Sequence, residues 1–349
     1  MHSKADRLLI LLLFLCLAVI TEHWQHRVGY LFSQPPMAQG PAIIRGYLDT
    51  WHSWATRQPP PSQITAATAS EWAPNVYRVL MPAIYAGLSM SRDATLAHSL
   101  LLLLLTFLLY AVLYQLGRIW FAPPLALGFV LLGIAINLNT WAVDPTGIMQ
   151  GILVAACVLA LVRRSALLYP AFFLLMANRE DGVVIIAFTA ILMLLDPTRR
   201  RQLLPVLGGL AAIAIAYEVG AHLWVGPRPR YCEVMRLHEN LQDPYYMLRT
   251  GNIHHPIALF FATFVPLVVA ALVGWRGKSP LLRSLALAAL AYLVVTYVFA
   301  CAREPHRNWQ VIVMLLPAAW WTLACRPPSS QASDGACECH GDPSELAQP

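Results

Sequence analysis

A short polar segment, residues 178–181 (Asn-Arg-Glu-Asp), interrupts an apolar part of the chain and constrains the fold more than any other feature. The apolar runs on either side, 166–177 and 182–195, are 12 and 14 residues long. A helix needs roughly 20 residues to cross a hydrocarbon core of ~30 Å. Basic residues border the pair at 163–164 and 199–201. If these borders mark the cytoplasmic side, the polar turn lies in a recess below the opposite membrane surface. Charge at that depth is costly, so we expect a functional site that opens to the non-cytoplasmic side.

The composition is typical of a polytopic membrane protein. Hydrophobic residues make up 58% of the 349 residues and charged residues only 12%, whereas soluble domains have about 25% charged residues. The net charge is +6, but the basic residues interrupt apolar runs instead of clustering with aromatic residues in a polar segment. Basic residues placed in this way act as orientation signals. We therefore expect membrane lipids as partners and no nucleic acid.

Ten apolar segments predict an all-α fold, a polytopic transmembrane helical bundle with about ten spans. The segments are approximately residues 7–21, 95–116, 123–138, 147–162, 166–177, 182–195, 203–225, 256–275, 284–301 and 310–324. The first resembles a retained signal anchor, because no small-x-small cleavage site follows it. An even number of spans with basic inner turns places both termini in the cytoplasm, most simply at a bacterial inner membrane. Residues 1–325 form the predicted transmembrane domain and 326–349 a disordered cytoplasmic tail.

Two long loops, 22–94 and 226–255, are predicted on the outer side. Apolar and aromatic residues at helical spacing in 42–51 indicate an amphipathic helix on the membrane surface. A second such stretch lies at 75–90. No inner connection exceeds about ten residues, and there is no glycine-rich nucleotide motif. The polar chemistry of this chain is therefore expected outside.

The candidate site residues are acids, arginines and one histidine, all predicted near the outer face. They are Asp49, Glu71, Arg78, Asp144, Arg179, Glu180, Asp181, Arg303, Glu304, His306 and Arg307. A carboxylate here can take a proton from an acceptor hydroxyl as a general base. Guanidinium groups can hold a phosphate or diphosphate in a bidentate manner.

Several of these residues also have a structural interpretation. The neighbouring pairs Arg179–Glu180 and Arg303–Glu304 could be ion pairs that brace helix ends. Asp144 precedes a proline and could simply be a turn-forming residue. Arg78 precedes an apolar helix and could extend its charge to the membrane surface. The expected convergence of these groups on one face favours function.

The order of features resembles the GT-C superfamily of integral membrane glycosyltransferases. A first helix is followed by a long outer loop with two surface helices and an acid, then by many spans with short inner turns. Residues 77–82 (Tyr-Arg-Val-Leu-Met-Pro) and 178–180 (Asn-Arg-Glu) also look like motifs of bacterial membrane proteins related to that class. The likeness covers about residues 1–325. It implies a polyprenyl-phosphate-linked sugar donor and a catalytic base in the first outer loop, Asp49 or else Glu71. The loop has no Asp-x-Asp or Glu-x-Asp pair, so the resemblance leaves the base and the use of a metal open.

The first functional hypothesis is accordingly a hexosyl or pentosyl transferase that moves sugar from the lipid-linked donor to a saccharide or lipid acceptor by an inverting displacement. Arg179 with Arg303 or Arg307 would hold the phosphate, and Glu180 and Asp181 would orient substrate or bind a divalent metal. The other candidates, Arg78, Asp144, Glu304 and His306, would contact substrate.

Two other classes remain open. A transporter or flippase of a lipid-linked saccharide would suit the short interrupted hairpin at 166–195, although no internal repeat accompanies it. An O-antigen polymerase or ligase would also work on the outer face with arginines of a large loop, but the arginine-rich loop here, 226–255, has only thirty residues.

Overall fold

The protein is described by a computed structural model that covers residues 4–31, 36–56, 78–88, 94–140, 145–225, 237–251, 256–299 and 308–324. In these residues there are thirteen α-helices, three short 3-10 helices and no strand. The all-α fold class is therefore confirmed.

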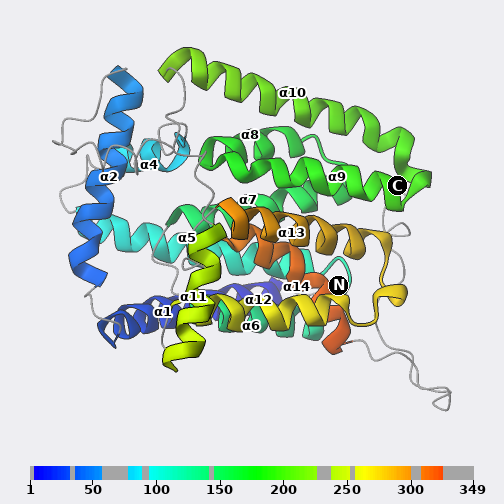
Figure 1. Cartoon of the computed structure of the whole chain (residues 1–349), viewed down its shortest axis with the longest axis horizontal. Coiled ribbons are helices and arrows are strands. Elements are labelled where there is room, and N and C mark those ends of the chain that lie inside the picture. Colours follow the sequence, from blue (N-terminus) through cyan, green and yellow to red (C-terminus); the bar gives the residue numbers. More distant parts are fainter. Residues whose placement is uncertain are drawn as a thin grey trace.

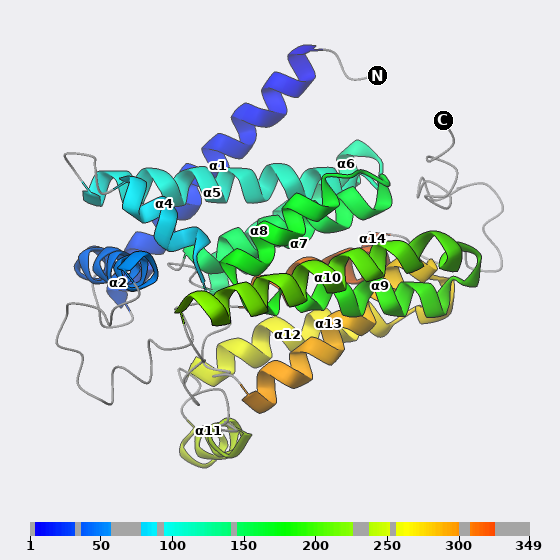
Figure 2. The same cartoon turned by 90° about the horizontal axis from the view of Figure 1, so that it is seen from above.

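Each of the ten predicted apolar segments forms a helix. Most of these helices run along the length of the molecule, whereas α1 crosses it obliquely (Figures 1 and 2). These helices are α1 (Lys4–Leu31), α5 (Ala94–Gly117), α6 (Pro123–Thr140), α7 (Pro145–Val162), α8 (Leu168–Asn178), α9 (Val184–Leu195), α10 (Arg200–Val225), α12 (Pro256–Leu272), α13 (Pro280–Phe299) and α14 (Trp309–Ala324). Four of them, α5, α7, α10 and α13, are long and apolar enough to cross a membrane, which indicates a membrane protein. The other six contain shorter apolar stretches.

The first helix is longer than the sequence analysis expected. We placed the start of the outer loop at residue 22, but α1 continues to Leu31. The reason is local, since no proline stops the helix before Pro35, and polar side chains alone do not end a helix.

A polar cluster inside the bundle holds α1 against α5 and α6. The Thr106 hydroxyl donates a hydrogen bond of 2.8 Å to Glu22 Oε1. The Tyr110 hydroxyl lies 2.9 Å from Thr21 Oγ1 and accepts a bond of 3.0 Å from Asn137 Nδ2. Hydrogen bonds of this kind fix helix pairs where apolar packing alone does not favour association.

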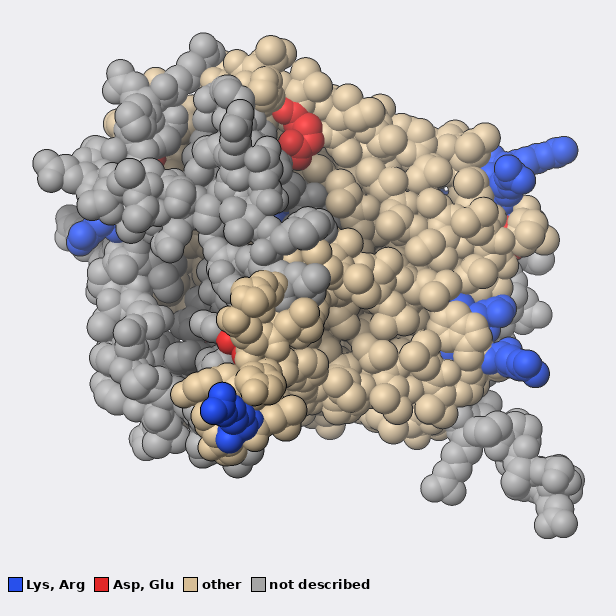
Figure 3. Space-filling view, in the orientation of Figure 1, with Lys and Arg blue, Asp and Glu red and all other residues tan. Residues whose placement is uncertain are grey.

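Four short connections lie at one end of the bundle, which we call the turn end: 118–122, 163–167, 196–199 and 273–279. Contacts across helices show that these connections meet. Trp320 Nε1 of α14 donates to the Leu125 carbonyl at the start of α6, at 2.9 Å. Arg163, after α7, donates to Gln115 near the end of α5 at 3.4 Å. On the face in Figure 3, Lys and Arg side chains gather at this end, and a broad uncharged band follows.

The opposite end, which we call the loop end, carries the remaining helices α2 (Pro36–Thr56), α4 (Leu80–Leu88) and α11 (Leu237–Thr250). Helices α2 and α11 run across the ends of the other helices (Figures 1 and 2). Helix α11 is attached to the end of α13, because Asn240 Nδ2 donates to the Tyr297 carbonyl and the Tyr297 hydroxyl donates back to the Asn240 carbonyl at 2.6 Å. The two helices expected in the first outer loop are thus present, and the second outer loop contains α11.

Helices α7 and α14 form the centre of the bundle, and α10 lies at its edge. In the apolar window of α7, 78% of residues are buried, against 17% for α10. Residues 309–319 of α14 are buried without a break. Polar side chains on α7 and α14 are therefore shielded from both lipid and solvent by neighbouring helices.

Candidate functional site

Helix α2 spans the loop end from α7 to α10. The Tyr47 hydroxyl is hydrogen-bonded to Thr146 Oγ1 in the first turn of α7. At the other end of α2, Trp224 Nε1 of α10 donates to the Trp54 carbonyl at 2.8 Å. The Tyr47 ring also stacks on Tyr85 of α4, with centroids 4.7 Å apart and planes 3° apart. These contacts hold the first outer loop over the ends of the spanning helices.

Asn178, the last residue of α8, joins the polar turn to α7. Its Nδ2 donates to the Thr146 carbonyl at 3.1 Å and to Gln150 Oε1 at 2.9 Å. The side chain is only 1% exposed. Because Thr146 also bonds Tyr47, one chain of contacts runs from α2 through α7 to the end of α8.

The turn after α8 has a definite backbone path. Arg179 is extended, with φ −159° and ψ 139°, and its N–H donates to the Leu175 carbonyl at 3.0 Å. A short 3-10 helix, η2 (Glu180–Val183), leads into α9. A Cβ on Gly182 would lie 2.9 Å from Met176 Sδ and 3.1 Å from Leu175 Cγ, so this tight turn favours glycine.

The Arg179 side chain lies in the interior at the loop end, with 8% of its surface exposed. Arg179 is therefore a buried cation at this turn, and its depth in a membrane remains a prediction. Glu180 and Asp181 lie on η2, but their side chains are outside the described part of the structure. The expected Arg179–Glu180 pair therefore remains a prediction.

Asp49 is half-buried on α2, two residues after Tyr47. Within the described residues its carboxylate makes no hydrogen bond or ion pair, so it is chemically available. Arg78 is half-buried immediately before α4. The first-loop acid and the recessed arginine thus belong to elements that Tyr47, Thr146 and Asn178 connect.

Six predicted site residues lie outside the described residues. They are Glu71, Asp144, Arg303, Glu304, His306 and Arg307. Pro145 and Asn308, which directly follow Asp144 and Arg307 in the chain, are buried at the loop ends of α7 and α14.

Three buried residues near this turn were missed by the sequence analysis. Gln150, Trp309 and Gln310 are all 0% exposed. They have side-chain nitrogen or oxygen atoms that make no hydrogen bond within the described part of the chain, and so does Asn178. An amide inside an apolar run, as in 147–162, is the sequence signal that could have identified Gln150.

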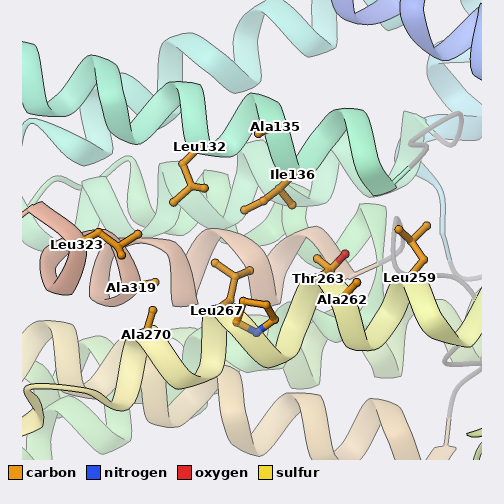
Figure 4. Close-up of a pocket in the computed structure, with 11 residues that line it drawn as sticks. Leu132, Ala135, Ile136, Leu259, Ala262, Thr263, Leu267, Ala270, Ala319 and Leu323 are labelled. Atoms are coloured by element: carbon orange, nitrogen blue, oxygen red, sulfur yellow. The ribbon is translucent and has the colours of Figure 1, made fainter.

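An apolar groove of about 370 Å³ lies between α6, α12 and α14 (Figure 4). It extends from Leu259 and Ala262, toward the loop end, to Ala270 and Leu323, toward the turn end. Thr263 is its one polar lining residue. A groove of this kind suits a hydrocarbon chain, because it offers contact area and few hydrogen-bonding groups.

Lys278, a second buried cation among the described residues, has a structural role at the turn end. Its Nζ donates to the Ala271 carbonyl at 2.9 Å and to Thr322 Oγ1 at 2.8 Å, and it also bonds the Val273 carbonyl. These carbonyls end α12, where a positive charge is favourable. Burial nevertheless lowers the pKa of Lys278 to about 8.

Among the described residues, no three His, Cys, Asp or Glu side chains are grouped so as to hold a metal ion. Glu180 and Asp181, which we expected to orient substrate or bind a divalent metal, are not covered by that statement because their side chains are not described.

Comparison with protein-family models, with curated proteins and with solved structures finds no match for this chain.

Proposed function

We propose that this protein is a multi-pass membrane glycosyltransferase. It transfers a sugar from a polyprenyl-phosphate-linked donor to a saccharide or lipid acceptor on the non-cytoplasmic face. The observation that carries the proposal is the connection between α2 and the α8–α9 turn. It brings an acid with no described partner, Asp49, and a recessed arginine, Arg179, to the same end of the bundle.

The orientation follows from the basic residues of the turn end. They are Arg118, Arg163, Arg164, Arg199, Arg200, Arg201, Arg276, Lys278 and Arg283. Short loops rich in Arg and Lys face the cytoplasm. With all ten apolar helices crossing the membrane, both termini are cytoplasmic and the loop end faces the periplasm or exterior. Helices α2 and α11 then lie along the non-cytoplasmic surface of the membrane.

The proposed reaction is a single inverting displacement. The Asp49 carboxylate accepts the proton of the acceptor hydroxyl while the acceptor oxygen forms a bond to the anomeric carbon of the sugar. The bond between that carbon and the phosphate oxygen breaks, and the electron pair leaves with the polyprenyl phosphate. The Arg179 guanidinium binds the phosphate oxygens and stabilises their developing charge.

A lipid-linked donor fits the rest of the molecule. The described connections at the turn end have at most seven residues, which is too short for a nucleotide-binding domain on that side. The apolar groove along α12 and α14 offers a place for the hydrocarbon chain of the donor. Glu71 is the second candidate for the base. Arg78, Asp144, Glu180, Asp181, Arg303, Glu304, His306 and Arg307 are the candidate substrate contacts.

The test is transfer by the purified full-length protein in proteoliposomes that contain a polyprenyl-phosphate sugar and a saccharide acceptor. Asp49→Asn keeps the shape of the side chain but cannot accept the proton, so we expect transfer to fall by roughly 10²–10⁴-fold. Asp196→Asn is the matched control at the turn end, where Asp196 pairs with Arg199 at 3.1 Å.

Three other outcomes separate the alternatives. If Asp49→Asn keeps full activity and Glu71→Gln abolishes it, the base is Glu71. If neither variant matters and lipid-linked saccharide still crosses the bilayer, the protein is a transporter or flippase. Formation of long polymers from lipid-linked repeat units would instead indicate an O-antigen polymerase.

A further inference from the structure

Four side chains at the loop end have hydrogen-bonding capacity that no described residue uses. The unused donors are Gln150 Nε2, Trp309 Nε1 and Gln310 Nε2, and the unused acceptors are Asn178 Oδ1 and Gln310 Oε1. Each side chain is at most 1% exposed. Buried polar atoms are almost always hydrogen-bonded, so a group of them in one place requires a partner such as water or a ligand.

These four residues, which we call the amide cluster, are held together by α7 and its neighbours. Asn178 Nδ2 donates to Gln150 Oε1 at 2.9 Å, so those two amides are in contact. The next residue on α7 is Gly151, where a Cβ would lie 3.2 Å from Trp309 Cβ. Gln310 follows Trp309 in α14, and α14 packs against α7.

The chemistry of the amide cluster selects a class of ligand. It presents three donors and two acceptors and no charge of its own. A metal ion would require carboxylates or other strong ligands, and an isolated anion would require cations. A sugar hydroxyl is both a donor and an acceptor and carries no charge. Uncharged amides and an indole N–H therefore match a neutral polyhydroxylated ring.

The amide cluster lies next to the proposed phosphate-binding residue. Asn178 is followed directly by Arg179, the proposed phosphate-binding residue, and both are buried. In a sugar phosphate the ring hydroxyls begin at the carbon next to the one that carries the phosphate. We therefore infer that the amide cluster binds the hydroxyl groups of the transferred sugar and determines which sugar is accepted. This inference rests on the proposed function.

The test replaces Gln310, because both polar atoms of its side chain are unused within the described residues. Gln310→Met keeps the length of the side chain and removes its hydrogen bonds. The probes are a polyprenyl-phosphate hexose and its deoxy analogues, each lacking one hydroxyl. We expect wild-type protein to discriminate against one analogue by at least about tenfold in kcat/KM. Gln310→Met should lose that discrimination and stay folded, because it removes a buried amide that has no described partner. Gln242→Met, on the exposed surface of α11, is the matched control.

Binding is measured separately, as the shift in Tm that each probe produces relative to polyprenyl phosphate alone. If Gln310→Met keeps both the discrimination and the Tm shift of wild-type protein, the amide cluster holds only water and the inference is wrong, whether or not transfer occurs. If the hexose probe raises the Tm of wild-type protein but not of Gln310→Met, while no acceptor is glycosylated, the amide cluster is a sugar site and the proposed transfer reaction is wrong.

Discussion

The Tyr47 hydroxyl of α2 and Thr146 Oγ1 of α7 are hydrogen-bonded, although 99 residues separate them in the sequence. The same Thr146 accepts a bond from Asn178 through its carbonyl. The acid-bearing helix of the first outer loop and the recessed polar turn are therefore positioned through one residue. Any change in this contact should alter the position of Asp49 relative to Arg179.

Tyr47→Phe should weaken this coupling without removing the ring that stacks on Tyr85. A lost hydrogen bond of this kind costs about 0.5–1.5 kcal/mol of stability. The rate of sugar transfer should fall by more than the loss of folding stability alone would cause, because α2 is no longer fixed over the turn. The measurements are the unfolding midpoint in detergent and kcat/KM in proteoliposomes. Tyr245→Phe, on the exposed surface of α11, is the control. Equal activity in the two variants would show that Tyr47 does not position the site.

Asn178→Ala removes both hydrogen bonds of the Asn178 amide and leaves Gln150 Oε1 unpaired among the described residues. Because the site is buried, we expect a loss of about 1–3 kcal/mol in stability. Gln115→Ala is the comparison, since its bond to Arg163 is long and exposed, at 3.4 Å. Denaturant or thermal unfolding measures both variants. Equal destabilisation would contradict a special role for the turn.

Arg179→Lys keeps the positive charge but loses the planar pair of donors. We expect the KM for the lipid-linked donor to rise about tenfold or more, with a smaller effect on kcat. Arg249→Lys on the exposed end of α11 tests whether any arginine at the loop end has this effect. If Arg179→Lys changes kcat alone, the residue acts on the transition state and does not hold the ground-state phosphate.

The orientation can be tested by placing cysteines at Glu180 and Arg200 in a background without the native cysteines. The proposed topology predicts that an impermeant thiol reagent labels the first from outside the cell and the second only from the cytoplasmic side. Labelling of both positions from the same side would exclude a hairpin in which η2 and the start of α10 lie on opposite sides.

Lys278 predicts a specific dependence of stability on pH. Its pKa is about 8 in the folded protein and 10.5 without the effect of burial. Between these values the unfolded chain binds a proton that the folded protein has released, so stability should rise as the pH increases from about 8 to 10.5. Below pH 8 both states are protonated, and this contribution should be constant.

Lys278→Met isolates that contribution from the other groups that titrate at alkaline pH. The difference in Tm between wild-type protein and Lys278→Met should be flat below pH 8 and change in favour of wild-type protein above it. A difference that is independent of pH would mean that Lys278 keeps its proton, held by the carbonyls that end α12.

The sequence by itself determined the helices, because an apolar run in a membrane must satisfy its backbone hydrogen bonds internally. This is why each of the ten segments became a helix and why the polar interruption at 178–181 was recognisable as a turn. The end of α1 was placed too early, because the polar side chains after residue 21 suggested a loop, although polar side chains alone do not end a helix.

Only the tertiary structure decided which polar groups share one place. Asp49 and Arg179 were named from the sequence by their chemistry, but their connection depends on the distant contact of Tyr47 with Thr146. The amide cluster depends on the packing of α7 against α8 and α14, so its members looked like isolated residues in the sequence. The physical reason is that apolar periodicity fixes local backbone structure, whereas hydrogen-bond partners far apart in the chain are selected by how the helices pack.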